Sequence, residues 1–413
     1  MTAEGFCSSR RSLVVLLASL LLSGPTFAQH IFTTLPRTVA GDENPVTFMR
    51  PHYQIHWAAV GAEVGPPSTA LTPSQMRHAY GFDQISNQGA GQIIGIVDAY
   101  DDPNAEADLA VFDAQFGLPA CTSANGCFRK VYSNGQRPAA NPNWALEIAL
   151  DIEWAHSIAP RATILLVETP TNSLANLLAG VATAVSNGAA EISMSWTVGE
   201  FSTENSYDNY FVASGVTFLA AAGDDGTGVS YPAASPDVVS VGGTSLHLTP
   251  NGAYQSETAW SGSGGGLSKF EHEPLFQALF PIPDDGKGYR ERGNPDVSFN
   301  ADPGTGVAVY DSVSVGGGVG WFQVGGTSAG TPQWAALIAI VNATRAAARK
   351  ANLSSANTNL YVIAKWPGGV FNTVTTGTSV TCVTPCRTRT GYNYITGLGT
   401  PVASALIATL ADR

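Results

Sequence analysis

Residues 143–168 read NWALEIALDIEWAHSIAPRATILLVE, and they contain both kinds of segment from which most of the chain is built. Residues 143–159 are apolar with carboxylates at intervals, which is typical of a helix with a buried face. Residues 162–168 form a short, continuous apolar run, which is typical of a strand covered on both faces. We therefore expect a helix that is followed directly by a buried strand.

Segments of the same two kinds alternate on either side. We expect strands at residues 92–100, 191–196, 216–223 and 238–243, and helices at residues 173–188 and 334–353, with a short helix between the strands at 191–196 and 216–223. A further helix begins at TPSQ, with Thr72 as its N-cap, Pro73 in its first turn and Gln75 completing a capping box. This alternation predicts an α/β fold with a parallel sheet covered on both faces, and with sites at the carboxyl ends of its strands.

The composition limits the classes of partner. The chain has 413 residues, of which 44% are hydrophobic and 13% charged, so it can build a sizeable core. A formal net charge of −12 argues against nucleic acid and anionic membranes as partners. At most 20 Lys and Arg and 7 His carry positive charge in acid, so repulsion between positive charges stays small there. This composition suits a protein that works in an acidic medium, or simply an acidic secreted protein. We expect a monomer.

The N-terminal region is typical of an export signal. Arg10 and Arg11 precede an apolar run at residues 13–22, and Thr26-Phe27-Ala28 offers a small-residue cleavage site. The run is too short to span a bilayer. We expect a signal peptide at residues 1–28, a short arm or remnant leader at 29–70, and a catalytic domain at 71–413 of a protein secreted to the periplasm or the medium.

Four cysteines remain after the signal: Cys121, Cys127, Cys382 and Cys386. Four cysteines allow three pairings, and export makes disulfides the expected state. Closeness in sequence favours Cys121–Cys127 and Cys382–Cys386. The alternative is a metal site, but neither pair has CxxC spacing.

The stretch GGTSAGTP, residues 325–332, places Ser328 on a glycine-rich turn before a long apolar helix. A serine hydroxyl becomes a nucleophile only when a base takes its proton, and histidine is the usual base. His156 lies near the far end of the helix expected at residues 143–159. An enzyme that uses His156 near neutral pH is one alternative.

The same helix carries Glu147 and Asp151, four residues apart and so on one face. Two neighbouring carboxylates repel each other when both are ionised, and a pair that shares one proton titrates with separated pKa values. One member of such a pair stays basic in acid. The alternative, and the commoner case for an isolated pair, is a solvated acidic face that also includes Glu153.

Asp224 follows a predicted buried strand within AAAGDDG, residues 220–226. Turn chemistry alone explains an aspartate before Asp-Gly. The functional alternative is a protonated carboxyl group that donates a hydrogen bond to a developing oxyanion, which requires a pKa above the working pH.

Taken in order, the motifs become recognisable. They are LTPSQMRHAYGF (71–82), IVDAYDDPN (96–104), the ExxxD at 147–151, SMSW (193–196), AAAGDDG, YPAASPDVVSVGGTSL (231–246), SGSGGGLS, NPDVSFNADPGTGVAVY (294–310) and GGTSAGTP. Together they resemble the sedolisin family of serine-carboxyl peptidases over about residues 71–407. The resemblance implies a subtilisin-like three-layer fold with a central, mostly parallel sheet.

The resemblance also implies roles for five residues. Ser328 would be the nucleophile, Glu147 the base, and Asp151 the acid that orients Glu147 and shares its proton. Asp224 would donate to the oxyanion beside the Ser328 N–H group, and Asp98 would be a further acid of the network. The implied activity is a secreted endopeptidase that works in acid through an acyl-enzyme. Alternatives are a tripeptidyl-peptidase and a catalytically silent, peptide-binding member.

The substrate cleft is less well defined by the sequence. We expect Trp196, with Ser195, and the loop 262–266, with Gly264 and Gly265, to line it. Packing and turn geometry explain a tryptophan and glycines at these positions equally well.

Two departures from the family stand out. Its C-terminal calcium site would correspond here to Thr373, Val374, Gly391 and Asn393, where Thr373 and Asn393 replace aspartates. Calcium favours charged oxygen ligands, so we expect a degenerate site and no cofactor for the chemistry. The family also has a long folded prosegment, whereas only residues 29–70 precede the resemblance; either the enzyme folds unaided or this arm does part of the task. Autoprocessing in this region is a hypothesis.

Overall fold

The computed structural model describes residues 47–56, 65–280, 282–283, 290–354, 356–365, 368–379 and 391–413. These residues belong to a single unit of the chain, Glu43–Arg413. The predicted signal peptide, and Cys382 and Cys386 with their predicted pairing, lie outside the described residues.

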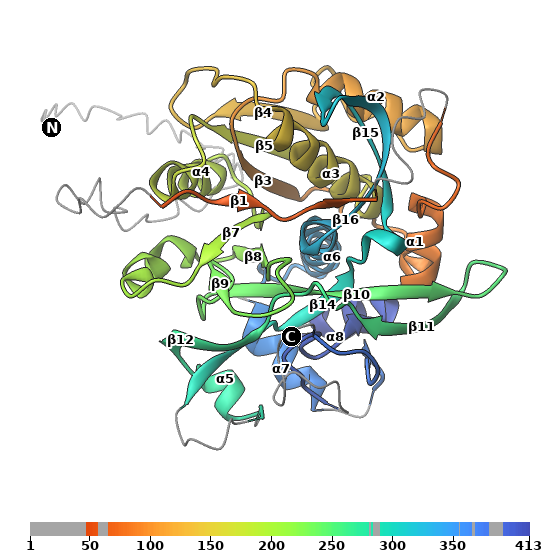
Figure 1. The fold of residues 1–413 in the computed structure, drawn as a ribbon. Helices are drawn as coiled ribbons and strands as arrows, with labels where there is room; N and C mark the ends of the chain where they lie inside the picture. Colours follow the sequence, from red (N-terminus) through yellow and green to blue (C-terminus); the bar gives the residue numbers. More distant parts are fainter. Residues whose placement is uncertain are drawn as a thin grey trace, which may run out of the picture. The chain divides into compact units, whose positions relative to one another are not determined.

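A central sheet of eight strands organises the unit (Figure 1). Its main path runs β11 (Tyr254–Ala259), β10 (Val238–Leu248), β8 (Thr217–Ala221), β6 (Glu191–Met194), β3 (Ile93–Ala99), β5 (Thr163–Thr169) and β4 (Phe128–Tyr132), and β14 (Val297–Asn300) also pairs with β10. All these pairings are parallel except that of β10 with the edge strand β11. The predicted parallel sheet is confirmed.

Helices cover both faces of this sheet. On one face α3 (Pro142–Ile158) and α6 (Thr327–Ala347) pack on each other and on the central strands. On the opposite face α4 (Leu174–Ser186) packs on β3 and β5. Alternate residues of β3 divide between two apolar cores: Ile94 and Ile96 belong to the larger one, and Val97 and Ala99 to the smaller. This period of two places apolar side chains on both faces, which explains the continuous apolar runs in the sequence.

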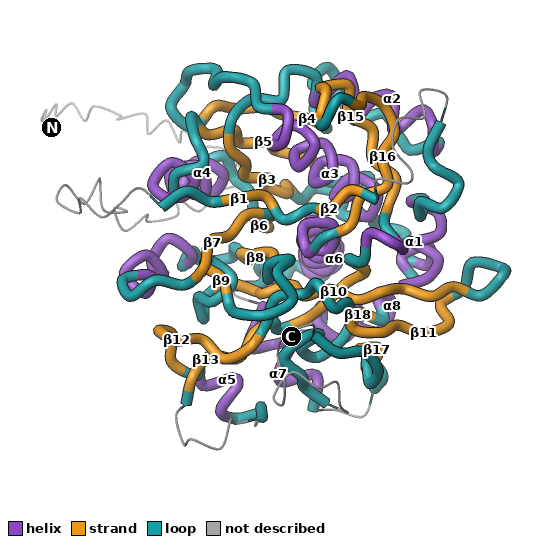
Figure 2. Tube along the Cα trace, viewed as in Figure 1, coloured by secondary structure: helices purple, strands orange, loops and turns teal. Residues whose placement is uncertain are grey.

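The remaining elements surround this core. The other helices are α1 (Pro73–Tyr80), α2 (Ala105–Phe116), α5 (Leu275–Ala278), α7 (Ala356–Ala364) and α8 (Ala403–Ala411), with short 3₁₀ turns η2 (Phe82–Gln84), η3 (Glu204–Phe211) and η4 (Pro303–Thr305). Two small sheets have the orders β1 (Arg50–Pro51), β7 (Trp196–Gly199), β9 (Ser230–Tyr231), and β15 (Val307–Val315), β16 (Gly318–Gly325), β2 (Gln54–Ile55). Two ribbons pair β12 (Gly266–His272) with β13 (Glu291–Asn294) and β17 (Phe371–Asn372) with β18 (Thr400–Pro401) (Figure 2).

The predicted elements agree with the structure in kind, with differences at their ends. The capping box of Thr72 and Gln75 is present, and α3 begins one residue earlier than expected because Asn141 caps it and Pro142 fills its first position. The strand expected at 191–196 divides at Ser195 into β6 and β7, which belong to different sheets. No helix of the described residues has both the length and the apolar character that a membrane crossing needs.

The expected arm contains an ordered part of the unit. Within residues 47–56, β1 pairs antiparallel with β7, and β2 pairs antiparallel with β16. Figure 1 shows β1 between α3 and β7. The expected start of the domain at residue 71 therefore leaves out a segment that contributes strands to two of its sheets.

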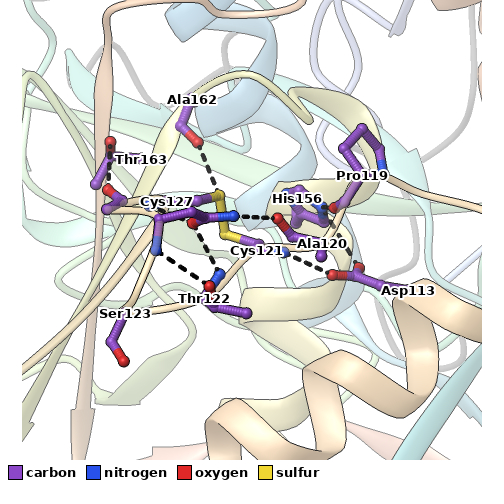
Figure 3. The surroundings of a disulfide bond; sticks show 12 residues. Asp113, Pro119, Ala120, Cys121, Thr122, Ser123, Cys127, His156, Ala162 and Thr163 are labelled. Atoms are coloured by element: carbon purple, nitrogen blue, oxygen red, sulfur yellow. Dashed lines mark hydrogen bonds and ion pairs between the residues drawn. A yellow bond between two sulfur atoms is a disulfide. The ribbon is translucent and has the colours of Figure 1, made fainter.

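A disulfide joins Cys121 to Cys127 with an S–S distance of 2.01 Å, as closeness in sequence predicted. It closes the loop between α2 and β4, and His156 of α3 lies beside it (Figure 3). The three side chains come close together, but the two sulfur atoms are bonded to each other and therefore offer no thiolate to a metal.

Trp334 links α6 to the sheet through a hydrogen bond. Its fully buried indole N–H donates to the Ser298 carbonyl of β14 at 2.9 Å. We expect Trp334→Phe to lower the free energy of unfolding by about 2 kcal/mol through a cavity and an unpaired carbonyl. Urea unfolding measures it. Ala347→Ser, at the exposed end of the same helix, is the control, and equal stability of the two variants would contradict this account of α6.

Candidate active site

The site lies where the start of α6 meets α3 and the loops after β3, β6 and β8. Ser328 is the second residue of α6 and is fully buried. Gly326, before the helix, has φ +106°, a conformation open to glycine and strained for other residues. A Cβ atom there would also lie 2.3 Å from the His52 carbonyl oxygen. The glycine-rich turn therefore lets another part of the backbone approach the serine.

Among the described residues, three carboxyl groups form a cluster that reaches Ser328 through Glu147, on which Asp151 and Asp98 act in turn. Glu147 and Asp151 come from α3, and Asp98 is the second-last residue of β3; all three are fully buried. The Ser195 hydroxyl donates to Asp151 Oδ1 at 2.8 Å, whereas neither oxygen of Glu147 accepts a hydrogen bond of normal geometry from the residues that the structure describes. The buried position of the pair excludes the alternative of a solvated acidic face.

Burial sets the protonation of these groups. Desolvation, and then the charges of Asp151 and Asp98, raise the pKa of Glu147 well above its usual range, while the nearby Ser328 hydroxyl lowers it. Desolvation and then Asp98 likewise raise the pKa of Asp151, and desolvation raises that of Asp98 to about 8. These groups interact closely, so the protons leave the cluster as a set.

The Ser328 hydroxyl is within reach of Glu147 but is oriented elsewhere. Its Oγ donates to the Ser195 carbonyl at 3.3 Å, and it accepts from the His52 backbone N–H at 3.2 Å. The hydroxyl lies close enough to Glu147 to lower the pKa of its carboxyl group, although the two groups do not form a hydrogen bond of normal length and angle. A rotation of the Ser328 side chain would redirect its proton toward Glu147.

Asp224 holds the turn before α6. Its Oδ1 accepts from the Thr327 N–H at 2.8 Å and from the Thr327 hydroxyl at 2.9 Å. Its buried Oδ2 has no hydrogen-bond partner among the described residues, and a Cβ atom at Gly326 would lie 2.6 Å from it. Desolvation raises the pKa of Asp224 to about 7, against the opposing effect of the Thr327 hydrogen bonds. Below that pH the group is a carboxylic acid with a proton to donate.

Residues 47–56 lie across Ser328 as an extended strand. On one side the Met49 N–H donates to the Asn172 carbonyl at 2.8 Å, and on the other Arg50 and Pro51 pair with Thr197 and Trp196. Beyond Ser328, Gln54 and Ile55 pair with β16. The strand therefore continues past the serine in both directions.

His52 lies directly at Ser328. Its N–H donates to the Ser195 carbonyl at 3.3 Å, and its carbonyl oxygen accepts from the Ser328 N–H at 3.1 Å. The same oxygen and Asp224 Oδ2 line the space beside Gly326. The carbonyl of the His52–Tyr53 peptide bond thus occupies the position at which an oxyanion would receive hydrogen bonds from Ser328 and Asp224.

Asn172 and Tyr100 hold this strand and were not predicted from the sequence. Asn172 binds the Met49 backbone at both its N–H and its carbonyl group, and Tyr100 donates its hydroxyl to Asn172 Oδ1 at 2.9 Å. Tyr100 has φ +65°, which is unusual for a residue other than glycine. The sequence offered one signal for Tyr100: it follows directly after the strand that ends with residues 96–99, IVDA.

The predicted cleft residues divide into two groups. Ser195 contacts the strand through its carbonyl, and Trp196 contacts it through its backbone while its indole donates to the Val97 carbonyl inside the core. Gly264 and Gly265 lie against the loop that follows β8, where Gly264 N donates to the Gly223 carbonyl at 2.7 Å. A Cβ atom at Gly264 would meet the Ala222 carbonyl at 2.3 Å, so this glycine serves close backbone packing next to Asp224.

His156 lies at a different place from Ser328. Its Nε2 is 2.8 Å from the Pro119 carbonyl and 3.4 Å from Asp113, beside the disulfide (Figure 3). Desolvation lowers its pKa to about 4. Neither contact involves the serine.

The residues that correspond to the family's calcium site do not fit calcium. Asn393 accepts from the N–H groups of Ile395 and Thr396 at 3.0 and 2.9 Å, and its Nδ2 donates to Thr396 Oγ1 at 2.7 Å. Nδ2 also faces the Val374 carbonyl at 3.5 Å. An amide N–H therefore points at an oxygen that a cation would need, and Thr373 and Gly391 bring no carboxylate.

The buried acids predict an unusual dependence of stability on pH. A carboxyl group whose pKa is raised in the folded state stabilises fully below its unfolded pKa, and this stabilisation is lost as the pH rises through the folded pKa. With the pKa of Asp98 at about 8 and that of Asp224 at about 7, we expect the free energy of unfolding to fall between about pH 4 and pH 8. Urea unfolding across this range tests it, and Asp98→Asn should reduce the slope; stability that rises from pH 4 to pH 7 would contradict the burial of these groups as acids.

Comparison with known proteins places this site in a family. Residues 139–412 match the model of the subtilase family, Peptidase_S8. Kumamolisin of Bacillus sp. (strain MN-32) is 32% identical, over 89% of this chain and 69% of that protein. Sedolisin of Pseudomonas sp. (strain 101) is 27% identical over 59% of this chain, and the match spans 45% of that protein.

A tripeptidyl-peptidase is also among the relatives: the probable tripeptidyl-peptidase SED3 of Trichophyton verrucosum (strain HKI 0517) is 26% identical over 91% of this chain and 70% of that protein. The structure of Pseudomonas sedolisin, solved with two molecules of pseudo-iodotyrostatin, superposes with a TM-score of 0.73 at 23% identity, covering 86% of this chain and 100% of that one. It confirms the subtilisin-like fold. The chain therefore belongs to the subtilase family and, within it, to the sedolisin group of serine-type peptidases.

Proposed function

We propose that this protein is a secreted, acid-active serine-carboxyl endopeptidase that hydrolyses peptide bonds of polypeptides through an acyl-enzyme on Ser328. The observation that carries the proposal is the buried set of Glu147, Asp151 and Asp98 beside the serine hydroxyl, with a strand of polypeptide bound across it. In a dry site a shared proton leaves one carboxylate basic under conditions in which an imidazole is charged and cannot accept a proton.

The acylation step follows from these positions. Ser328 Oγ attacks the carbonyl carbon of the bound peptide while Glu147 takes the hydroxyl proton, and Asp151 and Asp98 hold the remaining protons of the cluster. The carbonyl oxygen becomes an oxyanion that accepts hydrogen bonds from the Ser328 N–H and the protonated Asp224. Glu147 then returns the proton to the leaving amine as the C–N bond breaks.

The deacylation step repeats the exchange with water. Glu147 takes a proton from a water molecule that attacks the ester carbon, the same two donors hold the oxyanion, and the Ser328 oxygen leaves with the proton that Glu147 returns. The carboxylic acid product departs, and the cluster regains its starting protonation. Both steps need the cluster to carry one negative charge and Asp224 to be neutral.

These two requirements define the pH window. The acid limit of activity is the pH at which the Glu147, Asp151 and Asp98 cluster loses its first proton. We propose that this first ionisation lies in acid, because the first carboxylate to form meets two neutral neighbours and the Ser328 hydroxyl, and the mutual charges that raise the pKa values act only on the later protons. The upper limit is set by Asp224, which has a pKa of about 7 and ceases to be a donor when it ionises. We propose that activity rises from acid, passes through a maximum and declines toward neutral pH.

The bound strand favours endopeptidase activity over tripeptide release. A tripeptidyl-peptidase needs a free amino group three residues before the bond that it cuts. Here Met49 is the fourth residue before the His52–Tyr53 bond, and Thr47 and Phe48 continue the chain, with the Leu174 N–H donating to the Thr47 carbonyl at 3.0 Å. The binding site therefore accommodates a longer chain on this side.

Two other interpretations have less support. A silent, peptide-binding protein would not require the serine, the three buried acids and Asp224 to lie together. An enzyme that used His156 would need that histidine near Ser328, whereas it bonds to Pro119 and lies beside the disulfide. We further propose a monomer without nucleic-acid or membrane partners, and chemistry without a metal.

Variants at the site test this mechanism in casein digestion at pH 3–8. We expect Ser328→Ala to abolish activity and Glu147→Gln to lower kcat/KM about 10³-fold or more. Glu153→Gln is the matched control, because Glu153 is buried on the same helix but accepts from the Tyr310 N–H instead. His156→Ala should retain activity, and a chelator should not reduce it.

Asp224→Asn tests the role of Asp224 as a hydrogen-bond donor through the pH profile of activity. The amide keeps an oxygen for Thr327 and supplies N–H donors that do not titrate, so the decline near pH 7 should disappear from the pH profile. Asp224→Ala should instead lose about 10²- to 10³-fold at every pH. A Glu147→Gln variant with full activity, or an Asp224→Asn variant with an unchanged upper limit, would contradict the assigned roles.

The bound strand also predicts a self-cleavage. We expect the full chain, incubated in acid, to acquire an N-terminus at Tyr53, because the His52–Tyr53 carbonyl already lies between the donors of the oxyanion. N-terminal sequencing and intact mass measure it, and Ser328→Ala should stay uncut. A wild-type chain that becomes active with residues 47–56 intact would show that the strand is not bound as a substrate.

A further inference from the structure

The strand at residues 49–54 shows which side chains the cleft encloses. Met49 and His52 are 1% and 2% exposed, whereas the neighbouring Phe48 is 59% exposed and Arg50 is exposed as well. Since alternate residues of an extended chain face opposite sides, only some positions can be recognised. The two enclosed side chains are those of the first and fourth residues before the bond at Ser328.

We infer that the enzyme selects its polypeptide substrates at these two positions: an unbranched apolar side chain four residues before the cleaved bond, and a neutral hydrogen-bonding side chain directly before it. This inference rests on the proposed peptidase function and adds the substrate sequence to it. We call the two enclosing regions the Met49 pocket and the His52 pocket, after the residues that fill them.

The Met49 pocket is part of the smaller apolar core. Met49 packs in the same cluster as Trp144 of α3, Leu174 of α4 and Trp196 of β7. Asn172 holds the backbone of Met49 at 2.8 Å through its own carbonyl and at 2.5 Å through its side-chain amide. The fixed backbone directs the side chain inward, and a charged residue there would lose its hydration without gaining a partner.

The His52 pocket is polar, and within the part of the chain that the structure describes no carboxylate forms an ion pair with the imidazole. Thr197 Oγ1 lies 2.5 Å from His52 Nε2, and a Cβ atom at Gly223 would lie 3.7 Å from the imidazole. The charged group that acts on the ring is Arg50, whose own partner, Asp225, lies on the exposed side. Burial and then Arg50 lower the pKa of His52 to about 3, in agreement with a pocket that takes a neutral side chain.

The two pockets place different demands on a substrate. A buried threonine hydroxyl can pair with an imidazole or a carboxamide, and a lysine or arginine would bring an unpaired charge into the same space. The positions of Arg50 and Pro51 are less enclosed, so exchanges there should have smaller effects. The enzyme should therefore differ from a peptidase that recognises a basic residue before the cleaved bond.

A set of quenched fluorescent peptides with the sequence TFMRPHYQIH, residues 47–56, tests the inference. The full chain is first incubated in acid, and kcat/KM for each peptide is measured relative to casein hydrolysis. We expect cleavage between His52 and Tyr53, a loss of about 10- to 100-fold for Met49→Asp, and a change of less than about threefold for Met49→Leu. Phe48→Asp, at the exposed neighbouring position, is the matched control and should have little effect.

The His52 pocket is tested with the same peptides and one enzyme variant. His52→Lys should lower kcat/KM by at least about tenfold, and His52→Gln should retain most of it. Thr197→Val in the enzyme should lower the rate of cleavage of the His peptide about tenfold relative to that of a His52→Leu peptide. A general loss of fold would lower both rates together.

The outcomes separate the two proposals. If casein is digested in acid but the peptides are cut equally well whatever occupies positions 49 and 52, the inferred selectivity is wrong and the peptidase function stands. If neither casein nor any peptide is cut, the proposed function fails, and the selectivity fails with it. Cleavage at another bond of the peptide would contradict the register of residues 49–54 as a substrate.

Discussion

The proposed chemistry depends on carboxyl groups that are kept away from water beside a serine hydroxyl. Glu147 and Asp151 can lie on one face of α3 at little cost only if they do not both ionise, and Asp98 at the end of β3 adds a third acid to the same enclosed space. Burial, more than the repulsion between the carboxylates, keeps their pKa values high. The fold provides this enclosure because α3 and α6 pack on each other over the sheet, which brings the acids and the nucleophile together.

Asp224 extends the same principle to the oxyanion. It is connected to α6 through Thr327, so the proposed oxyanion donor and the proposed nucleophile are parts of one local structure. In the proposed mechanism only its neutral form can donate a hydrogen bond to the oxyanion. The upper pH limit of activity is therefore set by a carboxyl group that histidine-based enzymes do not need. Gly326 is required between them because any side chain would enter the space of the His52 carbonyl, which we propose is that of a bound substrate.

Local features made much of this predictable. The cap at Asn141, the proline at the start of α3, and the period of its apolar residues define the helix, and the spacing of Glu147 and Asp151 follows from it. The glycine-rich turn before Ser328 likewise marks a helix start. Residues 47–56 were assigned to the arm at 29–70 because two-residue strands have no periodicity and their partners, β7 and β16, are far away in sequence. Asn172, Tyr100 and Thr197 were missed for the same reason, since their role exists only once the strand is in place.

The central claim is that a carboxylate, rather than an imidazole, activates Ser328. It is tested most directly by the rate at which a small fluorophosphonate labels Ser328 as a function of pH, because this reaction reports the serine without selection of a peptide. The account predicts labelling of the acid-incubated wild type at pH 4–5 and its loss in Glu147→Gln, with His156→Ala unaffected. Labelling of Glu147→Gln at the wild-type rate in acid would contradict it.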